Sequence, residues 1–332
     1  GLRGPTPAEV RRVGWRRTTT GWFLPSHVDS TVTDQRILDA ATVVGDRGVV
    51  TGWAALHWLG GRWFEGLGAG GQERPVPLLT RLHVQPRPGI LITQERCSPQ
   101  EIVLVDGLRL TIPVRSVCFE MRYAPSELAA LTALDMAAYS DLVSLAEMRA
   151  YVETRNGWTG IPLCRAALAS GEENAWSPAE VEMRSIWVAN GHGRPQCNAP
   201  LFTPAGRHVG TPDLLDVDAG VLGQYDGGLH AAGRVRAADV RKDAAYRALG
   251  LETVTMLAAD RADGHRDFLT RLADAYARAE RRAGEPRPWT AVPPPWWVDT
   301  RTVEARRGLT ADQRRRFLRY RHPPDAPPRA GP

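Results

Sequence analysis

The sequence predicts an α+β protein with a small mixed N-terminal module, a helical connector and a C-terminal α/β domain. Three observations lead to this prediction. Residues 76–115 alternate apolar and polar positions, which is typical of short strands. Residues 116–170 change to helical periodicity. Residues 177–282 then give the element order α-β-β-β-α-β-α. A chain of 332 residues is long enough for two or three domains.

We assign residues 1–115 to the N-terminal module. It begins with a basic, aromatic stretch at 15–25 that favours a β-hairpin. Helices are expected at about 34–44 and 51–60, and Thr51 is the expected N-cap of the second helix. Four strands are expected near the end of the module, at 82–84, 89–93, 101–105 and 108–112.

The connector is expected at 116–172. The stretch 170–174, at the boundary with the next domain, has the composition of a linker. The C-terminal domain, 173–282, opens with Ser177 at a helix N-cap and Pro178 in the first turn. The elements that we expect after this helix are strands near 198–203, 207–217 and 220–226, a helix at about 236–249, a strand at 251–256 and a helix at 262–282.

Composition narrows the class of protein. No run of eighteen apolar residues occurs, and no segment of signal-peptide type follows the first residues, so we expect a cytoplasmic protein without a membrane partner. The four scattered cysteines favour reduced core thiols over a zinc site. The net charge is +5 and comes almost wholly from arginine, which weakly favours a polyanionic partner.

Two acids and an amide lie on two neighbouring predicted strands. Asp213 lies on the first strand, and Gln224 and Asp226 lie on the second. A tight turn would bring Asp213 and Gln224 side by side, and strand alternation places Gln224 and Asp226 on one face. Oxygen ligands of this kind suit Mg²⁺ or Mn²⁺, and such an ion can activate water for phosphodiester cleavage.

Further residues extend this candidate catalytic site. Glu180 on the first helix could hold a second ion or orient water, and His230 is a candidate general acid or base. Lys242 or Arg241, in the next helix, could contact the scissile phosphate. Each residue also has an ordinary structural explanation. Asp213 could end a strand, and Glu180 could stabilise a helix dipole.

The C-terminal residues 283–332 form a tail rich in proline, tryptophan and arginine, of which we expect only partial order. Its arginines, Arg314, Arg315 and Arg316 among them, are interleaved with aromatic residues. Such a mixture can bind phosphates and stack on bases. A solvated amphipathic helix that docks on the body of the protein is an equal alternative.

The order of these motifs resembles the PD-(D/E)XK nuclease superfamily, and most closely the endonuclease-like domain related to very-short-patch repair enzymes. Such domains carry Ser-x-x-Glu on a first helix, Asp on one strand and Glu-Tyr-Asp-Gly-x-x-His on the next. The matching residues here are Ser177, Glu180, Asp213, Gln224, Tyr225, Asp226, Gly227, His230, Asp239, Arg241 and Gly250. The resemblance implies a restriction-endonuclease-like fold and a Mg²⁺ or Mn²⁺ ion held by Asp213, Gln224 and Glu180.

The N-terminal module looks like the first half of actinobacterial AbiEi-family antitoxin proteins. The likeness rests on the hairpin at 15–25, the helix at 51–60 and the strand at 107–115. It implies DNA as a partner, together with a cognate toxin. Members of that family begin with a winged-helix segment. Little precedes Trp15 here, so we expect that segment to be shortened or missing.

One departure from the nuclease pattern separates two functions. Gln224 stands where the pattern has Glu, so the site loses one negative charge. At about 4 Å and an effective dielectric constant of about 20, a full charge is worth on the order of 4 kcal/mol to a bound ion. We therefore expect a metal-dependent endonuclease, or alternatively a degenerate, antitoxin-like DNA-binding protein. A third reading is a structural role in which the arginine tail binds an acidic protein.

Overall fold

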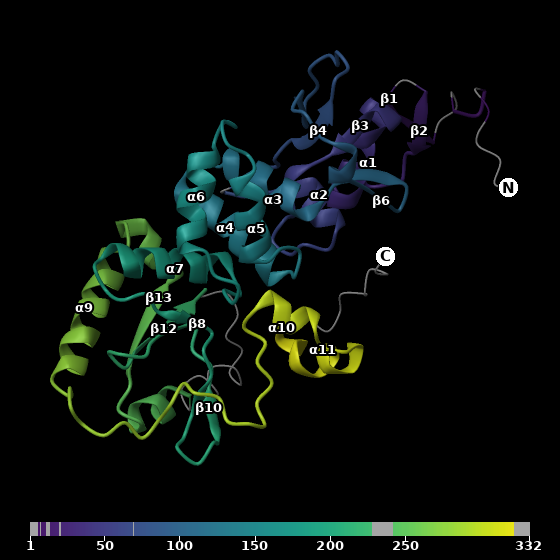
Figure 1. The fold of residues 1–332 in the computed structure, drawn as a ribbon. Helices are drawn as coiled ribbons and strands as arrows, with labels where there is room; N and C mark the ends of the chain where they lie inside the picture. The colour runs from purple at the N-terminus through teal and green to yellow at the C-terminus, as the bar shows by residue number, and fades with distance from the viewer. Residues whose placement is uncertain are drawn as a thin grey trace. The chain divides into compact units, whose positions relative to one another are not determined.

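The computed structural model describes residues 6, 8–10, 14–19, 21–68, 70–227 and 242–321. The chain is an α+β protein with several sheets, and it divides into two compact units (Figure 1). Unit 1 contains Gly1–Pro125 and Ala146–Ala166, and unit 2 contains Ser126–Leu145 and Ala167–Pro327. No helix in the described ranges combines the length and the apolar character that a membrane span needs.

Unit 1 contains a hairpin and a five-stranded sheet. Its strands are β1 (Trp15–Thr19), β2 (Trp22–Pro25), β3 (Gly48–Val50), β4 (Val76–Thr80), β5 (Ile90–Thr93), β6 (Ile102–Val105) and β7 (Leu108–Thr111). Strands β1 and β2 form the antiparallel hairpin. The sheet has the order β5-β4-β3-β7-β6. Its β3–β7 and β4–β5 pairs are parallel, and its β3–β4 and β6–β7 pairs are antiparallel.

The helices that begin in or next to unit 1 are α1 (Thr33–Val44), α2 (Gly52–Trp58), α3 (Pro113–Arg122), α5 (Leu145–Glu153) and α6 (Ile161–Ser170). The strand expected at 82–84 is wrong, because β4 lies earlier, at Val76–Thr80. All five residues of β4 are buried, so this central strand shows no alternation that sequence could reveal.

Thr51 is the N-cap of α2, as expected, but its side chain does not supply the capping bond. Its hydroxyl instead accepts a hydrogen bond from Thr111 at 2.9 Å. The N–H of Trp53 donates to Glu120 of α3 at 2.8 Å, so a carboxylate distant in sequence satisfies this helix end.

Unit 2 is built around a four-stranded sheet. The strands of unit 2 are β8 (Gln196–Cys197), β9 (Leu201–Phe202), β10 (His208–Gly210), β11 (Leu214–Asp216), β12 (Val221–Asp226) and β13 (Glu252–Leu257). The sheet has the order β13-β12-β11-β8, in which only β12 and β13 run parallel. Strands β9 and β10 form a separate antiparallel pair.

Helices cover both faces of this sheet. They include α7 (Pro178–Ala189), α9 (Arg266–Glu280) and a helical segment at 242–248, and α4 (Glu127–Tyr139) packs against α7. Gly223 of β12 faces α7, since a Cβ there would lie 3.0 Å from Trp187. Its neighbour Leu222 packs with Leu215 and with Tyr246 of the 242–248 helix. Because adjacent strand residues point to opposite faces, α7 and the 242–248 helix lie on opposite sides.

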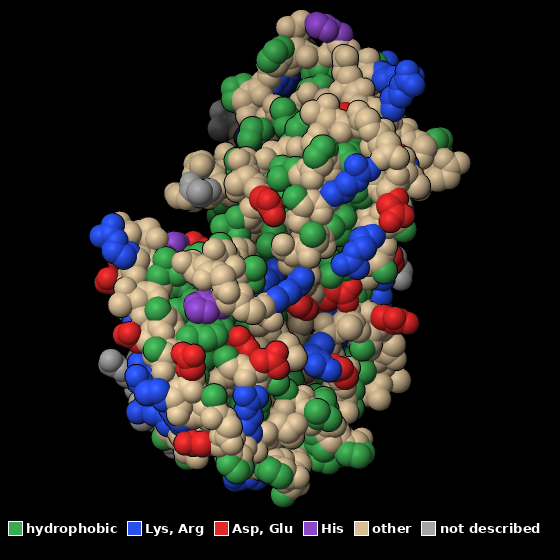
Figure 2. Space-filling model, turned by 60° about the vertical axis from the view of Figure 1, so that its left-hand side comes forward, with side chains coloured by type: hydrophobic (Ala, Val, Ile, Leu, Met, Phe, Trp, Pro, Cys, Tyr) green, Lys and Arg blue, Asp and Glu red, His purple; other side chains and the backbone are tan. Residues whose placement is uncertain are grey.

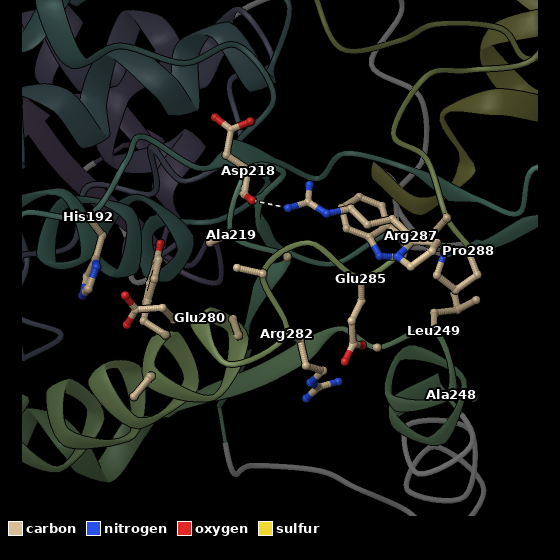
Figure 3. Close-up of a pocket in the computed structure, with 18 of the residues that line it drawn as sticks. His192, Asp218, Ala219, Ala248, Leu249, Glu280, Arg282, Glu285, Arg287 and Pro288 are labelled. Atoms are coloured by element: carbon tan, nitrogen blue, oxygen red, sulfur yellow. Dashed lines mark hydrogen bonds between the residues drawn. The ribbon is translucent and has the colours of Figure 1, made fainter.

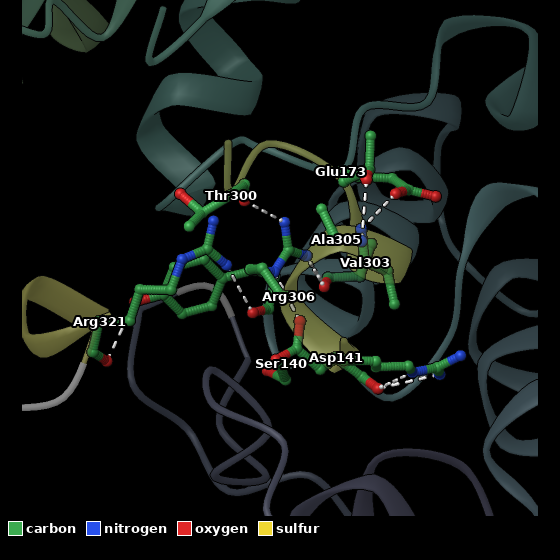
Figure 4. A network of polar contacts seen from close by, with 12 residues as sticks. Ser140, Asp141, Glu173, Thr300, Val303, Ala305, Arg306 and Arg321 are labelled. Atoms are coloured by element: carbon green, nitrogen blue, oxygen red, sulfur yellow. Dashed lines mark hydrogen bonds and ion pairs between the residues drawn. The ribbon is translucent and has the colours of Figure 1, made fainter. Parts of the chain in front are cut away.

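Residues 283–321 of the C-terminal tail, of which we expect only partial order, carry defined structure. This segment contains α10 (Val303–Arg307) and α11 (Ala311–Phe317), and it packs within unit 2. Arg306 is fully buried and donates to Asp141 at 2.6 Å and to the carbonyl of Ala138 at 2.7 Å (Figure 4). Arg321 donates to the carbonyl of Tyr139 at 2.8 Å. The two arginines thus satisfy carbonyl groups at the C-terminal end of α4.

The stretch at 170–174 is not a linker. Asn174 is buried, and its amide donates to the carbonyl of Cys197 at 2.8 Å and to the carbonyl of Asn198 at 3.2 Å. Asn198 in turn donates to the carbonyl of Asn174 at 2.8 Å. These exchanged bonds hold the segment before α7 against the end of β8.

Candidate functional site

A row of polar residues crosses the sheet of unit 2. Leu214 of β11 pairs with Gly223 of β12, so Asp213 and Gln224 follow as the next opposed positions. On one side, the N–H of Asn198 donates to the carbonyl of Asp213 at 2.9 Å. The row therefore runs from the end of β8 through Asp213 to β12, where strand alternation places Gln224 on the face of Leu222 and Tyr246.

Glu180 reaches this row from the first turn of α7. Its carboxylate accepts hydrogen bonds from the N–H of Trp176 at 2.8 Å, the hydroxyl of Ser177 at 3.0 Å and the amide of Asn198 at 2.7 Å. Burial, and then the negative charge of Asp213, raise the pKa of Glu180 to about 7. The carboxyl group therefore both caps its helix and interacts with Asp213.

An ion pair one turn along α7 fixes the position of this helix. Arg184 donates to Asp135 of α4 at 2.6 Å, and both side chains are buried. A second nitrogen of Arg184 lies 3.3 Å from the sulfur of Cys197 in β8. Burial raises the pKa of Asp135 to about 6, although Arg184 opposes the shift. The pair ties α7 to α4 and β8, which holds Glu180 above Asn198.

Asp213 is the partly exposed acid at the centre of the row. One of its oxygens accepts a hydrogen bond from the N–H of Tyr225 at 2.7 Å. Burial raises the pKa of Asp213, and the Tyr225 bond and the positive charge of Lys242 oppose that shift. The structure thus brings Lys242 within electrostatic reach of Asp213, and the Nζ atom of Lys242 lies 5.8 Å from the centre of the Tyr246 ring.

Three buried polar atoms near Asp213 have no hydrogen-bond partner among the described residues. They are Oδ1 of Asn198, Nε2 of Gln224 and the hydroxyl oxygen of Tyr246. A buried polar atom without a partner costs about 1–3 kcal/mol. The three atoms lie on the turn after β8, on β12 and on the 242–248 helix, and each could take a hydrogen-bond partner from a polar ligand.

These residues fit a hard cation in part. Across the described ranges, no group of three or more His, Cys, Asp and Glu side chains converges to hold a metal ion. Asp213 supplies a carboxylate and Asn198 an unpartnered amide oxygen, which are ligands that Mg²⁺ and Mn²⁺ prefer. In Gln224 the buried atom without a partner is the amide nitrogen, which donates hydrogen bonds and cannot bind a cation.

The other predicted site residues are exposed or lie outside the described residues. Asp226 is exposed at the end of β12. His230 and Arg241 lie outside the described residues. Sequence reasoning missed Asn198 and Tyr246. The only signal for Tyr246 was its spacing of four residues from Lys242, which puts both side chains on one helical face.

The tail arginines are largely engaged within unit 2. Arg314 donates to Asp141 at 2.7 Å and to the carbonyl of Arg306 at 2.7 Å. Arg315 pairs with Asp312, and the guanidinium of Arg316 lies 5.2 Å from the centre of the Phe317 ring. On the face drawn in Figure 2, basic and acidic side chains are interspersed rather than gathered in one basic patch.

A separate cavity of about 700 Å³ lies in unit 2 on residues other than the polar row. It is lined in part by α9 and by the segment after it (Figure 3). Arg287 donates to the carbonyls of Val217 and Asp218, and Arg282 pairs with Glu252. Because these cations already bind groups of the protein, the cavity is a weaker candidate than the row around Asp213.

Comparison of the chain with models of protein families, with curated proteins and with solved structures gives no match.

Proposed function

We propose that unit 2 is a metal-dependent phosphodiesterase domain of the PD-(D/E)XK type that acts on nucleic acid, with Asp213 as its main metal ligand. The observation that carries this proposal is the polar row itself. Asp213 lies between Asn198 and Gln224, near the raised-pKa carboxyl group of Glu180. Unpartnered polar atoms lie on both sides of it.

The topology of unit 2 supports the same proposal. Helix α7 is followed by the antiparallel strands β8, β11 and β12, then by the helix at 242–248, the parallel strand β13 and α9. This is the order that the resemblance to restriction-endonuclease-like folds leads us to expect, with the β9–β10 pair inserted after β8. Strand β12 places Gln224 beside Asp213, at the end of the hairpin.

Each residue has a distinct role in the proposed chemistry. Asp213 and Asn198 would hold the cation, which, when bound, would polarise the phosphate and lower the pKa of water. Lys242 would contribute positive charge beside the phosphate. Glu180, with a pKa of about 7, can hold or release a proton near neutral pH. DNA is the substrate that we propose first, because the resemblance to nuclease and antitoxin families implies it, and we propose a cytoplasmic location.

A second function is favoured by Gln224. With only one partly exposed carboxylate in the row, the site would bind a cation weakly, and catalysis would suffer accordingly. Unit 2 would then be an antitoxin-like DNA-binding domain without cleavage activity, and unit 1 would be free to bind a cognate toxin. Such a protein would bind DNA without a divalent ion, with an affinity that falls steeply as salt rises.

Asp213→Ala tests the proposed activity. Supercoiled plasmid DNA is incubated with the wild-type protein in MgCl₂ or MnCl₂, and nicked product is measured on a gel. We expect the variant to lose nicking by at least 100-fold while its circular dichroism spectrum stays unchanged. Asp218→Ala, at an exposed acid near the end of the same hairpin, should retain wild-type activity. Equal nicking by the wild type and Asp213→Ala would contradict the assignment.

A further inference from the structure

We propose that the hydroxyl group of Tyr246 is a further ligand-binding group of this site, and that it donates a hydrogen bond to an oxygen that arrives with the cation or with the substrate phosphate. This inference rests on the proposed function. It assigns a positioning role to a residue that lies outside the motif residues carried by the resemblance.

The hydroxyl group of Tyr246 differs from those of other buried or half-buried tyrosines in the described chain. Tyr139 donates to the carbonyl of Arg321 at 3.1 Å, Tyr276 donates to Asp216 at 2.6 Å, and Tyr151 donates to Glu101 at 2.5 Å. Tyr246 is fully buried, and its hydroxyl group has no hydrogen-bond partner among the residues that the structure describes. A buried phenol without a hydrogen bond destabilises the folded state by the free energy of its desolvation, unless a ligand supplies the acceptor.

Packing alone does not require a hydroxyl group at this position. The ring of Tyr246 belongs to an apolar cluster with Leu215, Leu222 and Leu251, which a phenylalanine ring could fill equally well. The chain instead makes room for the oxygen. A Cβ at Gly210 would lie 2.5 Å from the hydroxyl oxygen of Tyr246, so glycine is needed where β10 passes this atom.

The charges around the hydroxyl group indicate which kind of ligand it would bind. The charge of Asp213 is felt at Tyr246, and burial together with that charge raises the pKa of the phenol. The group therefore stays protonated and acts as a donor. Lys242, one helical turn away, places a cation over the ring. The negative charge of Asp243 acts on the phenol as well. A donor near carboxylates and an ammonium group suits a water in the hydration shell of a cation or a phosphate oxygen.

The test compares Tyr246→Phe with Tyr276→Phe, which removes a hydroxyl group that has two partners, Asp216 and Trp187. Without added metal, Tyr246→Phe should raise the melting temperature by about 2–6 °C, because it removes an unsatisfied buried group. Tyr276→Phe should lower it. This opposite response is one that a purely structural role of the Tyr246 hydroxyl group would not give.

Binding is then measured in two arms for both variants and the wild type. MnCl₂ is titrated alone by calorimetry, and a fluorescent DNA oligonucleotide is titrated in CaCl₂ by anisotropy. We expect Tyr246→Phe to weaken binding about 3- to 10-fold in at least one arm, with Tyr276→Phe unchanged. Loss in the manganese arm assigns the acceptor to the hydration shell, and loss only in the DNA arm assigns it to the phosphate.

Two results would overturn the inference. If Tyr246→Phe matches the wild type in both arms, or lowers the melting temperature as Tyr276→Phe does, the hydroxyl group has no ligand and the site must be redrawn without it. If the wild type binds neither MnCl₂ nor DNA, the proposed function itself fails, and Tyr246 fails with it.

Discussion

Glu180 and Asp213 are the two acids of this site whose pKa is raised, and Glu180 is the one that titrates near neutral pH. Its pKa is raised to about 7 in the folded protein from an ordinary value of 4.5. The folded state therefore binds more protons than the unfolded state between these values, so stability falls as pH rises through this window. Asp135, with a pKa of about 6, adds to the effect only below that pH.

We predict that the stability of the wild type falls by about 1 kcal/mol between pH 6 and pH 7, and that Glu180→Gln removes this loss. Urea unfolding at pH 6, 7 and 8 measures the slope. Glu182→Gln, on the same helix but paired with Arg261, should keep the wild-type slope. A slope that persists in Glu180→Gln would show that another group carries the proton.

Gln224 is the residue where a gain of function can be sought. Gln224→Glu adds a carboxylate opposite Asp213, which should tighten Mn²⁺ binding at pH 8 by at least tenfold, since one further charge at ~4 Å outweighs the amide. The same change should lower stability without metal, because two acids then face one another. Calorimetry and melting temperatures measure the two effects. Unchanged affinity for Mn²⁺ would show that Mn²⁺ does not bind beside residue 224.

At the scale of secondary-structure elements, the C-terminal segment depends on capping of α4. The carbonyl groups of Ala138 and Tyr139 lie at the end of that helix and receive Arg306 and Arg321. Sequence alone shows only a basic, proline-rich stretch, because the acceptors of these arginines lie more than 160 residues earlier. A docked amphipathic segment was one of the two readings, and the packing of Arg306 and Arg314 agrees with it.

Arg306→Met tests the energetic weight of this docking. The substitution leaves the carbonyl of Ala138 without its guanidinium donor, while Asp141 keeps its ion pair with Arg314, so unit 2 should be destabilised by about 1–3 kcal/mol. Urea unfolding followed by tryptophan fluorescence measures the change. Arg315→Met, at an exposed side chain of the same segment, should change stability by less than about 0.5 kcal/mol. Equal stability of the two variants would show that the segment contributes little.

At the scale of the whole molecule, sequence patterns predicted the features that depend on neighbouring residues, such as strand pairing, but not those that depend on residues distant in the sequence. The hairpin rule placed Asp213 opposite Gln224, because strand pairing and alternation are short-range properties. Asn198 could not be found in this way. It has a left-handed backbone with φ of 47° and joins the row only through contacts with Asn174 and Glu180. The strand β4 was also not predicted, because it is buried on both faces and therefore has no alternation of apolar and polar residues.

The two functions proposed for unit 2 differ in whether Asp213 holds a cation. Calorimetric titration of MnCl₂ into the wild type and into Asp213→Ala at pH 8, where Glu180 is mostly ionised, measures this directly. We predict saturable binding of about one ion by the wild type and a loss of at least tenfold in affinity in Asp213→Ala. Identical titration curves for the two proteins would contradict the account.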